Sequence, residues 1–198
     1  MIKKSYAYVA VLILLAFFAG SFLANTAGSK DNGITGKATG SVVFEQAVGK
    51  KAPDFVLDGI DDKKTKLSDY AGKVVILFFN EGEMCYPACW QQIAALGSDG
   101  RFNTGDVAAF SIVVDSKSMW KKIVGQVPQL SEAKILFDTS KAVSSAYDVL
   151  SLESSMHPGS YPGHTYVVID KGGVIRYVLD DPKMAIRNDQ LALEIEKL

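Results

Sequence analysis

The sequence predicts a single α/β domain built as a three-layer sandwich around a mixed β-sheet. Apolar runs rich in β-branched residues, at 73–79 and 107–114, alternate with segments of helical spacing at 86–96 and 117–125. Further on, two apolar segments flank the turn DKGG at 170–173, which is the pattern of a β-hairpin. Strands that alternate with helices and then end in a hairpin indicate a sheet with both parallel and antiparallel pairs.

The individual elements follow from the same apolar periodicity and from the glycines and prolines between them. We expect strands at 52–57, 64–67, 73–79, 107–114, 134–137, 164–169 and 174–179, helices at 86–96, 117–125, 141–149 and 189–198, a helical turn at 68–70, and a loop at 151–163.

Length and charge limit the classes of function. The 198 residues leave room for one domain of about 150 residues after a distinct first segment. The 21 Lys and Arg residues balance 22 Asp and Glu residues, for a net charge of −1. Because nucleic-acid binding needs clustered positive charge, we expect no nucleic-acid partner.

Residues 1–25 have the composition of a membrane-targeting segment. Lys3 and Lys4 precede an uncharged stretch whose apolar part, 6–24, would span roughly 28 Å as a helix. This predicts a single-pass signal anchor, with a cleaved signal peptide as the alternative. Positive charge ahead of the apolar stretch places the remaining chain outside the cytoplasm, either at the cell membrane or secreted.

Between this segment and the domain, residues 26–41 are rich in Gly, Ser, Thr and Asn, which predicts a flexible linker. The domain is then expected to occupy 42–198.

The only two cysteines, Cys85 and Cys89, directly follow the apolar run 73–79. We expect Cys85 at the N-cap of the helix 86–96, with Pro87 in the first turn, where free backbone N–H groups favour a thiolate. Cys89 comes one turn later, with Cα atoms about 6 Å apart, within reach of a disulfide. This spacing predicts a redox pair in which Cys85 attacks and Cys89 resolves. The alternative is two inert, buried cysteines.

Three motifs at consistent spacing resemble the redoxin branch of the thioredoxin fold. They are VGKKAPDF at 48–55, LSDYAGKVVILFF at 67–79 and HTYVVIDKGGVIRYV at 164–178, and the resemblance covers about 48–198. This branch includes peroxiredoxins of the alkyl hydroperoxide reductase/thiol-specific antioxidant group, membrane-tethered thiol–disulfide oxidoreductases and Sco-type copper proteins. The resemblance implies a thioredoxin-like fold and a thiol-based oxidoreductase that needs no cofactor. It also implies two kinds of partner: a peroxide or disulfide substrate, and a protein thiol as electron donor.

The cysteine segment departs from these relatives. Three residues, Tyr86, Pro87 and Ala88, separate the cysteines where thioredoxin-like oxidoreductases have two. Gly82 stands where peroxiredoxins carry a threonine, and Ala88 where a carboxylate is usual, so a typical peroxidase pocket is in doubt. We expect Tyr86, Pro87 and Trp90 to line or support the substrate pocket.

His164 supplies the alternative function. The resemblance places it at the start of a strand, facing the cysteine loop, as a pocket or supporting residue. The three-residue spacing is that of Sco-type proteins, in which both thiolates bind copper with a distant histidine. Cys85, Cys89 and His164 would then bind Cu(I), for which two thiolates and an imidazole are suitable ligands. A plainer role for His164 is to cap the strand or bond loop backbone.

The remaining polar residues near the motif are assigned to structure. We expect Glu81 and Glu83 to be solvated loop carboxylates, Met84 to fill core space and Arg176 to form a surface ion pair. His157 is expected to be a solvated loop residue, with a zinc site made of both cysteines and both histidines as the alternative.

Overall fold

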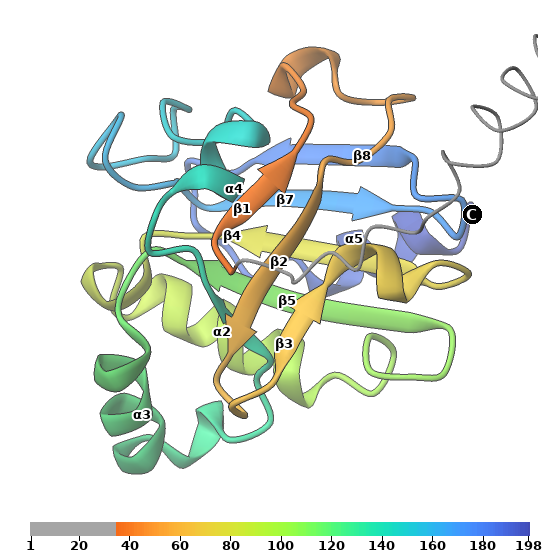
Figure 1. Cartoon of the computed structure of the whole chain (residues 1–198). Helices are drawn as coiled ribbons and strands as arrows, with labels where there is room; N and C mark the ends of the chain where they lie inside the picture. Colours follow the sequence, from red (N-terminus) through yellow and green to blue (C-terminus); the bar gives the residue numbers. More distant parts are fainter. Residues whose placement is uncertain (1–34) are drawn as a thin grey trace, which may run out of the picture. The chain divides into compact units, whose positions relative to one another are not determined.

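The computed structural model describes residues 35–198, which form one β-sheet with helices on both faces (Figure 1). The strands are β1 (Lys37–Thr39), β2 (Asp54–Gly59), β3 (Lys64–Lys66), β4 (Val74–Phe79), β5 (Val107–Val113), β6 (Ile135–Phe137), β7 (Thr165–Ile169) and β8 (Ile175–Asp180). The α-helices are α2 (Ala88–Ser98), α3 (Lys117–Gln126), α4 (Ala142–Ala146) and α5 (Asn188–Ile195). Short 3₁₀ turns are η2 (Phe44–Gln46), η3 (Leu67–Tyr70), η4 (Gly82–Met84) and η5 (Pro128–Leu130).

The sheet is mixed, as predicted. Its strand order is β1-β2-β6-β5-β4-β7-β8, and β3 pairs with β2. The pairs β4–β5 and β5–β6 are parallel, whereas β4–β7 and the hairpin β7–β8 are antiparallel. Strand β4 therefore lies between two neighbours, and all six of its residues are buried, which explains its unbroken apolar sequence.

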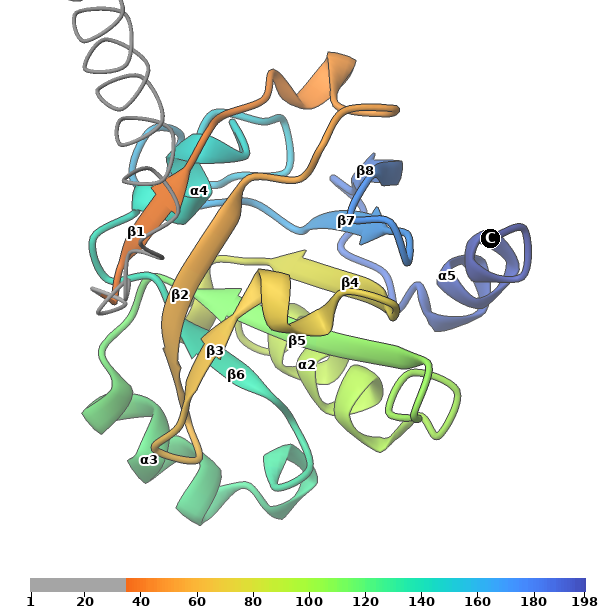
Figure 2. The same cartoon turned by 45° about the vertical axis from the view of Figure 1, so that its right-hand side comes forward.

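Side chains of β4 alternate between two hydrophobic cores. Ile76 and Phe78 belong to the core that α2, α3 and α5 cover. Val75, Leu77 and Phe79 belong to the core on the opposite face, which α4 and η2 cover (Figures 1 and 2). Because a hydrophobic core packs against each face of β4, the carboxyl end of this strand holds the following residues in a fixed position.

The ordered part begins earlier than expected. Residues 37–39, assigned to the linker 26–41, form β1 and pair antiparallel with β2, so the domain starts ahead of residue 42. A polar tripeptide, Lys-Ala-Thr, carries no apolar alternation, and only its partner strand makes it a strand.

Helix α2 begins later than the expected residue 86. Its first residue is Ala88, and Pro87 is the N-cap. Cys85 instead ends the 3₁₀ turn η4, through a bond from its N–H to the Gly82 carbonyl. The first helical turn is thus reached through η4 and a short turn. The prediction that Cys85 is the helix N-cap is wrong by two residues.

The predicted signal anchor at 1–25 lies outside the described residues. Within 35–198, none of the helices combines the length and apolar character needed to cross a membrane.

Candidate functional site

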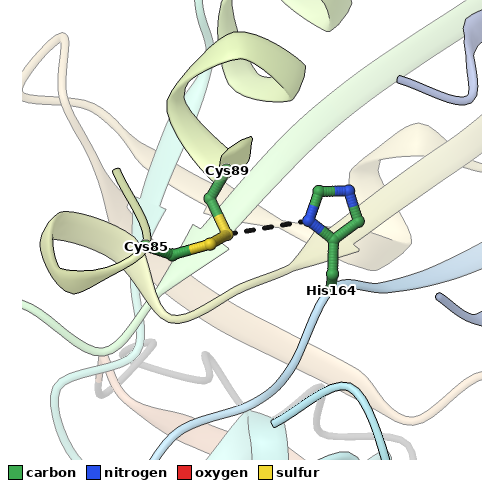
Figure 3. A group of neighbouring side chains, drawn as sticks. All are labelled: Cys85, Cys89 and His164. Atoms are coloured by element: carbon green, nitrogen blue, oxygen red, sulfur yellow. Dashed lines mark hydrogen bonds between the residues drawn. A yellow bond between two sulfur atoms is a disulfide. The ribbon is translucent and has the colours of Figure 1, made fainter. Parts of the chain in front are cut away.

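The two cysteines that the sequence singles out form a disulfide at the start of α2 (Figure 3), where Cys85 precedes the helix and Cys89 is its second residue. Their Cα atoms are 5.3 Å apart. Cys85 retains 2% of its accessible surface and Cys89 retains none. The bond is therefore enclosed by protein, and a reaction partner must reach it from the side of Cys85.

The segment that carries Cys85 is held by the side chains of buried Asn80 and half-buried Asp115. The Asn80 side chain accepts a bond from the Gly82 N–H (2.9 Å). The Asp115 carboxylate accepts bonds from the Glu83 N–H and from the Trp120 indole N–H, both at 2.8 Å. Gly82 has φ +66°, and a Cβ atom there would collide with the Asp115 carboxylate. The Asp115 side chain thus fills the space that a threonine at position 82 would need.

His164 lies directly beside Cys89 (Figure 3). Its Nδ1 is 3.7 Å from the Cys89 Sγ. Its Nε2 is 2.8 Å from the Tyr166 hydroxyl and 3.3 Å from the Ala185 carbonyl oxygen. The Phe78 ring meets the imidazole edge-on, with ring centroids 4.7 Å apart. The structure therefore brings His164 to the cysteines, where the resemblance places it.

His164 and Tyr166, the polar residues of what we call the inner wall beside Cys89, are both uncharged at neutral pH. Burial lowers the pKa of His164 to about 4, more than the nearby Asp181 carboxylate raises it. Burial likewise raises the pKa of Tyr166, so its hydroxyl keeps its proton, which it can donate to the Ala185 carbonyl (3.4 Å) while it accepts from the imidazole Nε2–H. A neutral imidazole has one unprotonated ring nitrogen, which can accept a hydrogen bond or bind a metal.

Cys85, Cys89 and His164 form a cluster whose ligand atoms all lie within 4.8 Å of one another. In the disulfide form the two sulfurs bond each other, so both become available to a metal only on reduction. The reduced set, two thiolates and an imidazole, suits Cu(I). His157 is not in this cluster, and its Nδ1 instead lies 3.4 Å from the Glu81 Oε1. The four-ligand zinc alternative therefore lacks its fourth ligand here.

Glu81 is completely buried, so its assignment as a solvated carboxylate is wrong. Its Oε1 accepts bonds from the Met156 N–H (2.6 Å), the His157 N–H (3.0 Å) and the Ser155 hydroxyl (3.2 Å). These contacts join the loop 151–163 to the cysteine segment. Two of these partners are backbone N–H groups and all three are about 75 residues away, so the sequence gives no sign of the contact.

The outer side of the disulfide exposes apolar side chains. Tyr86 is 71% exposed and packs edge-on against Trp90, whose indole N–H donates to the Gly82 carbonyl (3.2 Å). Met84 is 47% exposed, so the expectation that it fills core space is wrong.

Other predicted residues lie as expected. Glu83 is exposed, Arg176 forms an ion pair with Asp170 (2.6 Å), and the His157 side chain is 42% exposed.

An open groove of about 630 Å³ runs beside α2, and we call it the α2 groove. Tyr86, Pro87 and Trp90 line it from the cysteine segment and α2, while Val127 and Ile186 come from elsewhere in the chain. Sequence reasoning named the first three but missed the last two, because only folding brings them to α2.

Comparison with known proteins gives the family. The sequence profile described as the AhpC/TSA family matches residues 48–178. Peroxiredoxin-2 of Bos taurus is 31% identical over 144 residues, which cover 69% of this chain and 70% of that protein. The chloroplastic 2-Cys peroxiredoxin BAS1 of Spinacia oleracea is 30% identical over 140 residues, which cover 66% of this chain and 51% of that protein.

Solved structures agree at the level of the fold. The reduced 2-Cys peroxiredoxin of Plasmodium vivax superposes with a TM-score of 0.63 at 24% identity, over 76% of this chain and 81% of that one. The peroxidoxin BcpB of Mycobacterium tuberculosis gives 0.62 at 19% identity, over 77% and 97%. With its thioredoxin-like sheet and its disulfide at the start of α2, the chain belongs to the AhpC/TSA family and is a thiol-based oxidoreductase.

Proposed function

We propose that this chain is a membrane-tethered, exported thiol–disulfide oxidoreductase whose catalytic unit is the Cys85–Cys89 couple. The observation that carries the proposal is the asymmetry of the disulfide. Cys89 has no exposed surface and lies against His164, whereas Cys85 adjoins the exposed residues Met84 and Tyr86. The Cys85 sulfur can therefore react with a partner, while the Cys89 sulfur stays within bonding distance of it.

In the reduced enzyme, the Cys85 thiolate attacks one sulfur of a substrate disulfide. A mixed disulfide forms, and the second substrate sulfur leaves as a thiolate that takes up a proton. The Cys89 thiolate then attacks Cys85, which forms the observed disulfide and releases the reduced substrate. An external dithiol reverses the protein half of this sequence and is itself oxidised.

The inner wall prepares Cys89 for its step. In the reduced state the Cys89 S–H can donate to the unprotonated Nδ1 of His164, which already lies 3.7 Å away. The Tyr166 hydroxyl and the Ala185 carbonyl fix the imidazole on its other side. His164 is thus a positioning residue for the resolving thiol in this proposal.

A disulfide is preferred to a small peroxide as the substrate for two reasons. The Asp115 carboxylate fills the space above Gly82, and Ala88 supplies no carboxylate, so two groups expected of a peroxidase pocket are absent from their positions. The α2 groove, which Tyr86 and Pro87 line directly after Cys85 in the chain, is also far larger than a peroxide, whose size is near that of a water molecule at roughly 30 Å³. Peroxide consumption remains the second candidate activity, supported by the peroxiredoxin relatives.

Turnover assays on cysteine variants test the proposal. Cys85→Ser should lower disulfide turnover at least about 100-fold, because serine is a far weaker nucleophile near neutral pH. Cys89→Ser should accumulate a mixed disulfide with substrate, visible by mass spectrometry. Full activity of Cys85→Ser would refute the proposed function, and faster turnover of hydrogen peroxide than of any disulfide would favour the peroxidase.

The location is part of the proposal and is supported by the composition of residues 1–25, with Lys3 and Lys4 ahead of an apolar stretch. Membrane fractionation of the full chain, with an alkaline wash, should leave the protein in the membrane pellet. External protease should digest the domain in intact spheroplasts. Recovery of the intact domain in the cytoplasmic fraction would contradict the proposal.

Copper binding is a third candidate function, favoured by the cluster of Cys85, Cys89 and His164. The Ala185 carbonyl and the Tyr166 hydroxyl next to Nε2 are the kind of supporting contacts that orient a metal-bound histidine. Titration of the reduced protein with Cu(I) should then give one equivalent bound, lost in His164→Ala. Absence of tight binding to the reduced protein would exclude this function.

A further inference from the structure

We infer that the α2 groove is the docking site for a polypeptide that presents its own thiol or disulfide beside an uncharged, apolar segment. The inference rests on the proposed function and adds the class of partner to it. Tyr86 and Pro87, which directly follow Cys85 in the chain, line the groove. A chain lying in the groove therefore lies against the residues next to the reacting cysteine.

The apolar side chains around the disulfide are exposed, although most such residues elsewhere are buried. Met84 and Tyr86 flank Cys85 in sequence, with 47% and 71% exposure. Met156, at 53%, donates its N–H to Glu81 of the cysteine segment, and Ile186, at 56%, follows the residue whose carbonyl contacts His164. Exposed apolar groups gathered around one reactive centre are typical of a binding surface.

The loop that carries Ile186 is fixed from both sides. The Asp181 carboxylate accepts bonds from the Ala185 N–H (3.0 Å) and from the Arg187 guanidinium (2.6 and 2.7 Å). The Arg187 N–H donates to the Gln92 side chain of α2 (2.8 Å). Ile186 is thus held outward on an ordered loop, so little conformational entropy is lost when a partner covers it.

The lining of the groove suits a peptide. Among the described residues, no charged side chain lines the groove, so an acidic or basic partner segment gains nothing there. Gln91 and Gln129 lie in this otherwise apolar lining, and each amide offers one hydrogen-bond acceptor and one donor group. Peptide N–H and C=O groups can use both, whereas a hydrocarbon chain can use neither. From Pro87 to Ala94 the groove follows about 10 Å of helix, the length of roughly three extended residues.

The docked partner itself supplies the two electrons that reduce the Cys85–Cys89 disulfide. A thiolate of the partner attacks the Cys85 Sγ, the Cys85–Cys89 bond breaks, and Cys89 leaves as a thiolate that takes up a proton. The partner's second thiolate then attacks the mixed disulfide. This closes a disulfide in the partner and releases Cys85. The enzyme gains the two electrons that the partner loses.

The test uses the oxidised full-length protein and three reductants. Two are synthetic dithiol peptides of equal length, one with Leu and Phe beside its cysteines and one with Glu and Lys there, and the third is dithiothreitol. We expect the apolar peptide to reduce the disulfide about tenfold faster than the charged one. Ile186→Ser should remove most of that preference without changing the rate with dithiothreitol by more than about twofold.

Leu193→Ser is the matched control, since Leu193 is 59% exposed on α5 and does not line the groove. It should keep the wild-type preference. Equal rates with the two peptides, or an Ile186→Ser protein that keeps the preference, would overturn the inference. The inference would also be overturned if Ile186→Ser impaired only the consumption of an apolar hydroperoxide, or only the self-association of the chain. Failure of the proposed function is separate, because it would appear as full activity of Cys85→Ser.

Discussion

The two sulfur atoms of the Cys85–Cys89 disulfide lie in different surroundings. Around Cys89 the wall is closed and built of neutral polar and aromatic groups, His164, Tyr166 and Phe78. Around Cys85 the surface is apolar and exposed, and it continues into the α2 groove. The difference indicates that the two cysteines have separate roles: the surface around Cys85 recognises the partner, and the residues around Cys89 control the resolving thiol.

This division depends on the cysteine segment keeping its place between the two sides. Gly82→Thr should break it most severely. The substitution forces a β-branched residue to φ +66° and drives its side chain into the Asp115 carboxylate. We expect the free energy of unfolding to fall by about 4 kcal/mol, from backbone strain and from loss of the bonds to Asp115. Chemical denaturation measures it.

Gly100→Thr is the control, because a Cβ atom there meets nothing within 4 Å and the residue is exposed. It should cost under about 1 kcal/mol. Equal stability of the two variants would show that Asp115 does not fix the segment.

The closed side should be sensitive to acid through His164. Its pKa is about 4 in the folded protein against 6.5 as the ordinary value, so between these pH values the unfolded chain binds a proton that the folded protein does not. Stability is therefore unaffected above pH 6.5 and falls as the pH drops toward 4, by about 3 kcal/mol in all. Unfolding measured from pH 7.5 to 4 should show a flatter dependence for His164→Gln. Parallel curves for the two proteins would contradict the assignment.

The open side depends on the loop 151–163, which Glu81 holds. Glu81→Ala should leave the Met156 N–H without its acceptor and the His157 N–H with only the Ser155 Oγ at 3.2 Å, at a cost of about 2 kcal/mol. Hydrogen exchange at these two amides should accelerate with the loss of stability. Glu83→Ala, an exposed carboxylate in the same segment, should change neither quantity. If both variants behave alike, the loop is held by other contacts.

Sequence reasoning reached the parts of this comparison that depend on local pattern. The strands around 73–79 and 107–114, the hairpin 170–173 and the cysteine pair are marked by apolar runs, turn glycines and spacing. The resemblance then brought His164 to the pair, which no spacing could have done, since 75 residues separate it from Cys89.

The parts that escaped prediction depend on contacts between distant residues. Glu81 and Glu83 are the same residue type, two positions apart. Glu81 is buried because amides of the loop 151–163 bond to it, whereas Glu83 is exposed. The helix starts at Ala88 because η4 and Asp115 set the path of the preceding residues. The α2 groove exists only because the loop with Ile186 folds onto α2.

The smallest expected effect distinguishes the two sides by a single oxygen atom each. Tyr166→Phe removes the hydroxyl 2.8 Å from the His164 Nε2, while the Ala185 carbonyl at 3.3 Å remains as a partner. Because one of two partners is kept, the cost should be about 1 kcal/mol of stability. Tyr86→Phe, which removes a hydroxyl from a side chain that is 71% exposed, should cost less than about 0.5 kcal/mol. Denaturant titration of both variants measures the difference. A larger loss of stability from Tyr86→Phe than from Tyr166→Phe would mean that Tyr86, and not the inner wall, holds the disulfide in place.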